Sequence, residues 1–296
     1  MYFPVAGIEV NPLVPPLVAF VVSFFTSMGG VSGAFMLLPF QVSVLGYSAP
    51  SVSATNQLFN IVAIPGGIYR FIREQRMLWP LAWAVIIGTL PGVFIGAWVR
   101  VQWLPDPKNF KFFAGMVLLY LGYRLVLDVW KGGKGKSMAG ARGKQPSVGQ
   151  ATFSMVKISF EFDQETYSVS TFQIYLLCFI VGIIGGIYGI GGGSIIAPFM
   201  VAIFGLPVYT VAGAALMGTF ATSIAGVAFY SFLARFYPGI SVAPDIGLGI
   251  LFGVGGLAGI YLGARCQKYF SPRVIKAVLC FCVLFVAGKY ILGFFV

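Results

Sequence analysis

The sequence predicts an all-α polytopic membrane protein with two inverted-topology repeats and about 8–10 transmembrane segments, including short, glycine-interrupted half-helices. Three observations lead to this fold class: the composition, the spacing of charged residues and an internal repeat. Hydrophobic residues make up 58% of the 296 residues and charged residues only 9%, and the mean hydropathy is +0.92. Because a soluble domain has about 25% charged residues, too few polar side chains are present to cover a water-facing surface.

Two stretches of the chain contain no charged residue over a length that one segment cannot fill. One runs from Glu9 to Arg70 and the other from Glu165 to Arg235. Because a membrane-spanning helix needs about 20 apolar residues, each stretch must hold several segments. The chain is therefore expected to enter the membrane many times.

The second half of the chain repeats the pattern of the first. The segment GVSGA at residues 30–34 aligns with GIGGG at 189–193, and GVFIGA at 92–97 aligns with GIYLGA at 259–264 after a short extra stretch. Because these and other matches occur in the same order, we interpret the chain as a duplication. We expect a first repeat over residues 1–129, a cytoplasmic linker over 130–171 and a second repeat over 172–296.

Each repeat contains five apolar segments. Those of the first are Leu13–Met28, Ala34–Leu45, Ser51–Tyr69, Trp79–Val99 and Phe110–Val129. Those of the second are Phe172–Tyr188, Ser194–Phe204, Tyr209–Leu233, Ile246–Ala264 and Val274–Leu292. The first two segments of each repeat are short and separated by glycines, as in a broken, hairpin-like pair, although five full spans per repeat also fit the pattern.

The basic residues predict an orientation in the inner cell membrane. The connections at 70–76, 131–157 and 265–276 are strongly basic, so the positive-inside rule places them in the cytoplasm and both termini outside. The basic connection at 100–111 would then lie outside, against the rule. Within the linker, residues 152–170 alternate between apolar and polar, which predicts a small strand or hairpin outside the membrane.

Several classes of function are disfavoured. The chain has no His, and its four Cys lie in or beside apolar segments, so no metal or other cofactor is expected. Without His the serines lack their ordinary activating base, which argues against an enzyme. The net charge of +11 resides in short loops beside apolar segments, where the positive-inside rule accounts for it without a nucleic acid partner.

The glycine runs mark a candidate substrate site. Short, glycine-interrupted segments at matching positions of two repeats are typical of transporter substrate sites, and the N–H groups at the helix starts that follow favour an anion. The candidate residues in these runs are Gly30, Ser32, Gly33, Ala34, Gly191, Gly192, Gly193 and Ser194. Alternatively, the glycines only allow close helix packing, which we favour for scattered glycines such as Gly88, Gly253 and Gly255.

A second polar set lies in the third segment of each repeat. Asn56 and Gln57 in the first repeat face Thr219 and Thr222 in the second, and Asn60 shares a helical face with Asn56. Because an unpartnered amide in hydrocarbon is costly, these side chains should point into the protein. They are candidates for binding substrate oxygens. Hydrogen bonding that holds the helices together is an equal alternative.

The duplicated pattern of a glycine-rich turn, a short helix and Pro-Phe, GGVSGAFMLLPF and GIGGGSIIAPF, resembles the TauE/SafE family of membrane permeases. The segment LPVYTVAGAALMGTFATS also fits. The resemblance implies export of a small sulfur-containing anion, such as sulfite, sulfoacetate or another organosulfonate. The expected partners are this anion and the lipid bilayer, with a homodimer left open.

Two alternative functions stay open at this point. One is an importer or antiporter of another small anion, such as thiosulfate or a carboxylate. The other is a membrane scaffold without transport, in which the glycine turns would be closed and dry. The first hypothesis is alternating access, in which the two repeats rock about an anion held at the half-helix N-termini.

Overall fold

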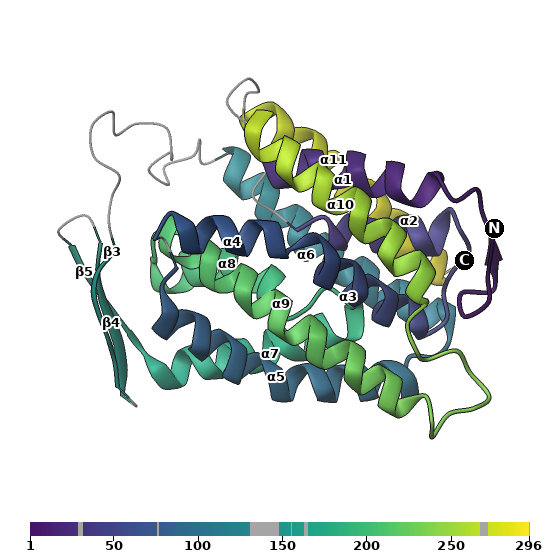
Figure 1. Ribbon diagram of the computed structural model, residues 1–296, viewed down its shortest axis with the longest axis horizontal. Coiled ribbons are helices and arrows are strands. Elements are labelled where there is room, and N and C mark those ends of the chain that lie inside the picture. The colour runs from purple at the N-terminus through teal and green to yellow at the C-terminus, as the bar shows by residue number, and fades with distance from the viewer. Residues whose placement is uncertain are drawn as a thin grey trace.

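The computed structural model describes residues 1–28, 32–75, 77–130, 148–154, 156–162, 165–266 and 272–295, and most of them are helical (Figure 1). The helices of the first half are α1 (Val14–Met28), α2 (Ala34–Ser43), α3 (Ser51–Ala63), α4 (Pro65–Arg73), α5 (Trp79–Gln102) and α6 (Pro107–Trp130). Those of the second half are α7 (Thr171–Tyr188), α8 (Gly193–Phe204), α9 (Val208–Leu233), α10 (Ile246–Cys266) and α11 (Pro272–Phe295).

The helices include several that can cross a bilayer. Within the described residues, five are long and apolar enough: Trp79–Gln102, Pro107–Leu127, Thr171–Tyr188, Thr210–Leu233 and Ile246–Gly263. Shorter apolar helices cover Val14–Ser27, Ala34–Ser43 and Leu279–Phe295. A polytopic membrane protein, as the composition predicts, is thereby confirmed. It is mostly helical rather than all-α, because short strands accompany the helices.

Three helix pairs form the frame of the bundle: α1 packs along α10, α5 along α7, and α6 along α11. Glycine allows two of these pairs to approach closely. A Cβ atom added at Gly92 of α5 would overlap the carbonyl oxygen of Phe179 in α7, and one added at Gly259 of α10 would overlap that of Phe20 in α1. Backbone-to-backbone contact of this kind is how small residues hold membrane helices together.

The scattered glycines also pack closely, as expected. A Cβ at Gly88 would lie 2.7 Å from the Cβ of Cys178, and one at Gly255 would overlap the backbone of Pro16. A Cβ at Gly253 would overlap the side chain of Val62. The packing role predicted for these three glycines is confirmed.

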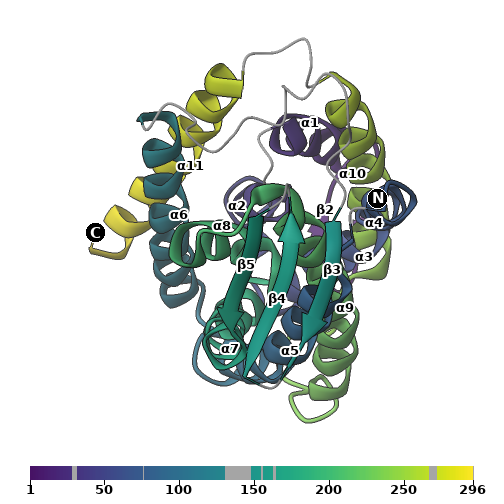
Figure 2. The same cartoon turned by 90° about the vertical axis from the view of Figure 1, so that its left-hand side faces the viewer.

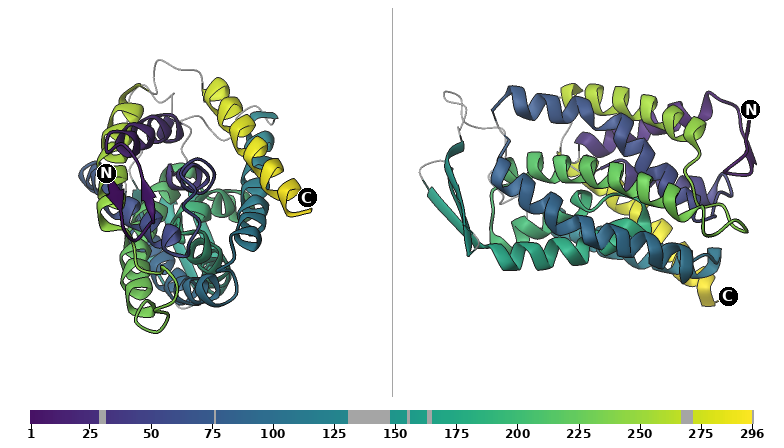
Figure 3. Two further views of the ribbon diagram at one scale, coloured as in Figure 1. Left: turned by 90° about the vertical axis from the view of Figure 1, so that its right-hand side faces the viewer. Right: turned by 60° about the horizontal axis from the view of Figure 1, so that its bottom comes forward.

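Helices α1 and α2 form a hairpin that enters the bundle from the end that holds both termini (Figures 1 and 3). Hydrogen bonds of Ser241 show where the open end of this hairpin lies. The Ser241 hydroxyl donates to the carbonyl of Val5 (2.6 Å) and lies 2.8 Å from the hydroxyl of Ser51. The segment before α1 therefore lies beside the start of α3. The start of α2, where Ala34 is buried, consequently lies inside the bundle.

Helices α7 and α8 form a second hairpin, which enters from the opposite end. The Thr171 hydroxyl at the start of α7 donates to the carbonyl of Ser154 in the linker (2.8 Å). The residues that follow α8 return to the same end, where Gly213 of α9 packs against Phe71 and Met77. The start of α2 and the turn between α7 and α8 approach each other inside the bundle, where Asn56 bonds to both.

One expected segment is divided. The apolar stretch Ser51–Tyr69 forms two helices, α3 and α4, where the sequence predicts one. Proline has no N–H to continue the helical hydrogen-bond ladder, so α3 ends at Ala63 and α4 begins at Pro65. Helix α4 extends past the expected end to Arg73 and is amphipathic, with Ile68 buried and Arg70 bonded to Glu74 (2.7 Å).

The linker forms an antiparallel sheet at the end opposite the termini (Figure 2). Its strands are β3 (Val148–Phe153), β4 (Lys157–Phe162) and β5 (Glu165–Ser170), in that order. Ile158 pairs with Val169 and Phe160 with Tyr167, and Ile158 and Phe160 are buried. A further two-stranded ladder, β1 (Tyr2–Phe3) with β2 (Ile8–Glu9), lies at the N-terminus and was not expected from the sequence. The glycine-rich run of the linker lies outside the described residues.

Candidate substrate site

The turn between α7 and α8 contains two glycines in conformations that other residues avoid. Gly189 has φ +83° and Gly191 has φ +72°, in the left-handed region where a side chain is strained. Gly189 ends α7 by donating its N–H to the carbonyl of Gly185 (2.9 Å). A Cβ at Gly189 would overlap the backbone of Ser53, so α3 packs directly on the turn.

The start of α8 is enclosed by neighbouring helices. A Cβ at Gly192 would lie 2.7 Å from the Cβ of Thr89 in α5, and one at Gly193 would overlap the carbonyl oxygen of Ala215 in α9. The backbone N–H of Gly192 donates to the hydroxyl of Thr222 (3.2 Å). The glycines therefore have the packing role of the alternative interpretation, and anion binding by this helix start stays a proposal.

Replacing Thr222 tests how much this helix start depends on its side-chain partner. A Thr222→Val variant keeps the shape but leaves the buried Gly192 N–H without the hydroxyl, and we expect a loss of stability of about 1–3 kcal/mol. Thr222→Ser, which restores the hydroxyl, is expected to recover most of it. Thermal unfolding in detergent measures both variants. Equal midpoints for the valine and serine variants would show that the bond contributes nothing.

Asn56 connects the two hairpins. Its side-chain N–H₂ donates to the carbonyl of Ala34 at the start of α2 (3.0 Å) and to the carbonyl of Gly189 in the α7–α8 turn (3.1 Å). Its Oδ1 accepts a bond from the side-chain amide of Gln41 (3.3 Å). One buried asparagine of α3 thus joins a residue of the first half of the chain to a residue of the second half.

Asn60, one turn further along α3, extends this cluster to α9. Its side-chain N–H₂ donates to the carbonyl of Ile190 (3.1 Å) and to the hydroxyl of Ser223 (3.4 Å). We call the buried polar residues at this junction the central polar cluster: Gln41, Ser53, Asn56, Gln57, Asn60, Thr219, Thr222 and Ser223. All are uncharged, so any ligand here meets amides, hydroxyls and backbone groups.

The central polar cluster has hydrogen-bonding capacity that no described protein atom uses. Both amide atoms of Gln57, Oε1 of Gln41 and Oδ1 of Asn60 are buried without a partner among the described residues. All three side chains are 0% exposed. Leaving such a group unpaired costs about 1–3 kcal/mol, so the cluster favours a bound species that offers hydrogen-bonding groups.

The remaining expected residues behave differently. The hydroxyl of Ser32 accepts the backbone N–H of Ala34 (3.3 Å), and Thr219 and Thr222 donate to carbonyls one turn earlier in α9. Gly33 packs against Ser23 and Thr26 of α1. Gly30 lies outside the described residues, as does the side chain of Ser194.

Two residues of the junction were absent from the set expected from the sequence. Gln41 belongs to the central polar cluster, and Tyr188, the last residue of α7, donates its hydroxyl to the carbonyl of Phe35 in α2 (2.8 Å). Gln41 is a polar residue inside a short apolar segment, which is itself an indication of an inward-facing position.

Comparison with known proteins assigns the family. A family model described as sulfite exporter TauE/SafE matches residues 16–290. The chain belongs to the TauE/SafE family. The sequence-based resemblance is thereby confirmed, and membership in a family of membrane transporters confirms the expectation that the chain is not an enzyme.

This TauE/SafE chain is also similar to the probable membrane transporter protein YunE of Bacillus subtilis (strain 168). The two are 27% identical over 143 residues, which cover 47% of this chain and 46% of the relative. The aligned part therefore spans about half the length of this curated relative. Among solved structures, none matches the TauE/SafE chain.

Proposed function

We propose that the protein exports a small sulfur-containing anion, such as sulfite, sulfoacetate or another organosulfonate, by alternating access. The observation that carries the proposal is the position of Asn56, which bridges the start of α2 and the turn before α8. The same cluster holds four unpaired amide atoms: Oε1 of Gln41, Oε1 and Nε2 of Gln57, and Oδ1 of Asn60. The family description, sulfite exporter, supports the class of substrate.

The same proposal includes two inverted repeats. Under the alignment of the two halves, α1 corresponds to α7, α2 to α8, α3 and α4 to α9, α5 to α10, and α6 to α11. The pairing of α1 with α10 then has its equivalent in the pairing of α7 with α5, and α6 pairs with its own equivalent, α11. This reciprocal packing, together with hairpins entering from opposite ends, supports a pseudo-two-fold relation between the halves.

A neutral site suits an anion that must be released again. Backbone N–H groups and the positive ends of short helices attract negative charge, and Nε2 of Gln57 adds an unpaired donor among the described residues. The central polar cluster is buried in this structure, so transport requires the hairpins to move relative to the frame. A cell interior at negative potential favours outward movement of an anion by about 2.3 kcal/mol per charge per 100 mV.

The orientation expected from the positive-inside rule belongs to this proposal. Both termini lie at one end of the molecule and the linker sheet at the other (Figure 3). We assign the sheet end to the cytoplasm and the end with the termini to the outside. A homodimer is compatible with this arrangement and is left to experiment.

Flux measurements test the function. Proteoliposomes loaded with sulfite or sulfoacetate are expected to release the anion faster than protein-free liposomes, and faster still when the loaded compartment is held negative. Thiosulfate and a small carboxylate serve as comparison substrates. If only thiosulfate and the carboxylate are transported, the proposed substrate class is wrong. If none of the four anions is transported, the proposal of anion export is contradicted.

A further inference from the structure

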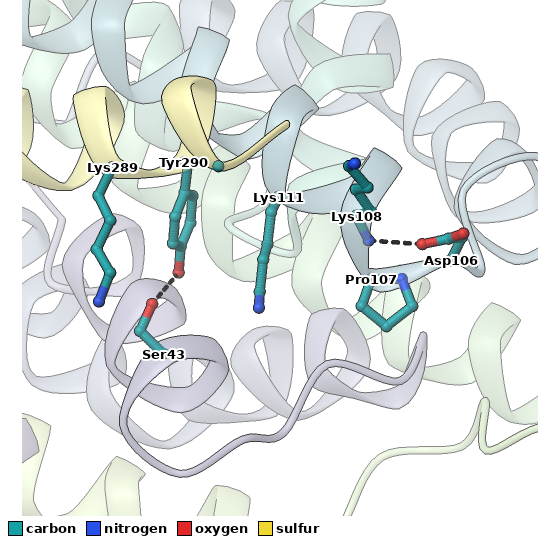
Figure 4. Close-up of a pocket in the computed structure, with 8 residues that line it drawn as sticks. Ser43, Asp106, Pro107, Lys108, Lys111, Lys289 and Tyr290 are labelled. Carbon is teal, nitrogen blue, oxygen red and sulfur yellow. Dashed lines mark hydrogen bonds between the residues drawn. The ribbon is translucent and has the colours of Figure 1, made fainter. Parts of the chain in front are cut away.

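A pocket of about 490 Å³ lies away from the central polar cluster, where α2 ends, α6 begins and α11 ends. Figure 4 shows the residues that line it: Ser43, Asp106, Pro107, Lys108, Lys111, Lys289, Tyr290 and Gly293. In Figure 4 the side chains of Lys111 and Lys289 extend on either side of Tyr290 toward the end of α2. The pocket lies at the end of the molecule that holds both termini.

The charge of this pocket is strongly unbalanced. It contains three lysines and one aspartate, a formal charge of +2. The carboxylate of Asp106 accepts the backbone N–H of Lys108 (2.6 Å) and so caps the first turn of α6. In the part of the chain that the structure describes, no carboxylate forms an ion pair with the three ammonium groups. Three like charges around one cavity favour a negative ligand.

Uncharged groups in the pocket complete an oxyanion environment. The hydroxyls of Ser43 and Tyr290 lie 2.8 Å apart, and Tyr290 also donates to the carbonyl of Pro39 (3.4 Å). Because either hydroxyl can be the donor in the first bond, the pair can reorient toward a ligand oxygen. The N-terminal end of α6, with Pro107 as its first residue, adds the positive end of a helix dipole.

The sequence singles out the same segment for a separate reason. The connection at 100–111, which carries Lys108 and Lys111, is the basic connection that the expected topology places outside, against the positive-inside rule. Both lysines lie in the first turns of α6, and a ligand for them explains why this side keeps its positive charge. Lysine is a compact point charge that suits phosphate and similar groups.

We propose that this pocket is a second oxyanion site, which binds a phosphate- or sulfate-type group through Lys111 and Lys289, with Lys108 adding to the positive field. The group is supplied either by the headgroup of an anionic lipid or by a free oxyanion. The site goes beyond the proposed transport function and is distinct from the central polar cluster. Ser43 and Ala34 are the opposite ends of α2, which at 1.5 Å per residue is about 15 Å long.

Two binding assays on the purified full chain distinguish the sources of the oxyanion. In neutral detergent, sodium sulfate is compared with sodium chloride at equal ionic strength, with the thermal unfolding midpoint as the readout. For the lipid, retention of phosphatidylglycerol against phosphatidylcholine is measured by native mass spectrometry. The variants are Lys111→Gln/Lys289→Gln and, as a matched control at the opposite end, Lys157→Gln/Arg265→Gln. Gln57→Leu serves as the control for the central polar cluster.

In at least one of the two assays, sulfate or phosphatidylglycerol is expected to bind equally well to three proteins: the wild type, the Lys157→Gln/Arg265→Gln control and Gln57→Leu. The Lys111→Gln/Lys289→Gln variant is expected to lose about tenfold or more in affinity there, because two charges close to the ligand are removed. If the variant loses affinity for sulfate, the ligand is a free oxyanion. If it loses affinity for phosphatidylglycerol, the ligand is a lipid headgroup. Equal binding by wild type and the Lys111→Gln/Lys289→Gln variant in both arms overturns the proposal. Because the readout is binding, a failure of transport leaves the result unaffected.

Discussion

A Gln57→Leu variant is expected to transport its substrate at least about tenfold more slowly than the wild type, while its thermal stability stays the same or rises. The reason is that both amide atoms of Gln57 are buried without a partner among the described residues. Removing such a group relieves a desolvation penalty of about 1–3 kcal/mol. During transport the same amide is expected to bond the charged substrate, so its loss raises the free-energy barrier to transport by a similar amount. A rise of about 1.36 kcal/mol slows transport tenfold.

Two measurements distinguish a role of Gln57 in substrate binding from a role in holding helices together. Sulfite efflux from proteoliposomes measures transport, and thermal unfolding in detergent measures stability. Gln173→Leu, at an exposed position of α7, is the matched control and is expected to change neither. Unchanged efflux with a raised unfolding midpoint would remove Gln57 from the substrate site.

A Gly92→Ala variant is expected to destabilise the protein by about 1–3 kcal/mol, although alanine is the better helix former. The added Cβ would overlap the carbonyl oxygen of Phe179 and lie 2.8 Å from the backbone nitrogen of Ile183, so two backbones must separate. Overpacking of this kind costs about 1–3 kcal/mol. The unfolding midpoint should fall by roughly 5 °C in differential scanning measurements.

Gly288→Ala provides the control for helix propensity. Gly288 lies within α11 and an added Cβ would meet nothing within 4 Å. Glycine to alanine at such a position is expected to be neutral or to stabilise by up to about 1 kcal/mol. If Gly92→Ala and Gly288→Ala have the same midpoint, close contact between α5 and α7 does not contribute to stability.

The helices themselves were largely predictable. Apolar length and the positions of Gly and Pro are local properties, and they located α5 from Trp79 and α7 to Tyr188. The division of Ser51–Tyr69 into α3 and α4 was also local in origin, since Pro65 interrupts the hydrogen-bond ladder. Hydropathy alone predicts one segment here, because the stretch is continuously apolar and the missing N–H of Pro65 does not change its hydropathy.

The candidate site was predictable only in part. Gly191, Gly192 and Asn56 could be named because irregular backbone and amides are unusual inside a membrane. Whether these glycines serve packing or binding could not be decided, because both roles require a missing side chain. The structure adds the packing partners, Thr89 and Ala215, which come from other helices.

Taken alone, the sequence determined that this protein lies in a membrane and where most of its helices begin and end. These properties depend on composition and on neighbouring residues. Only the tertiary structure decided which polar groups meet: Asn60 reaches Ile190 across 130 positions of sequence, and Asn56 reaches Gly189 across 133. Such contacts depend on how helices from both halves pack, and in an apolar chain that packing follows backbone shape and small residues, which local patterns do not encode.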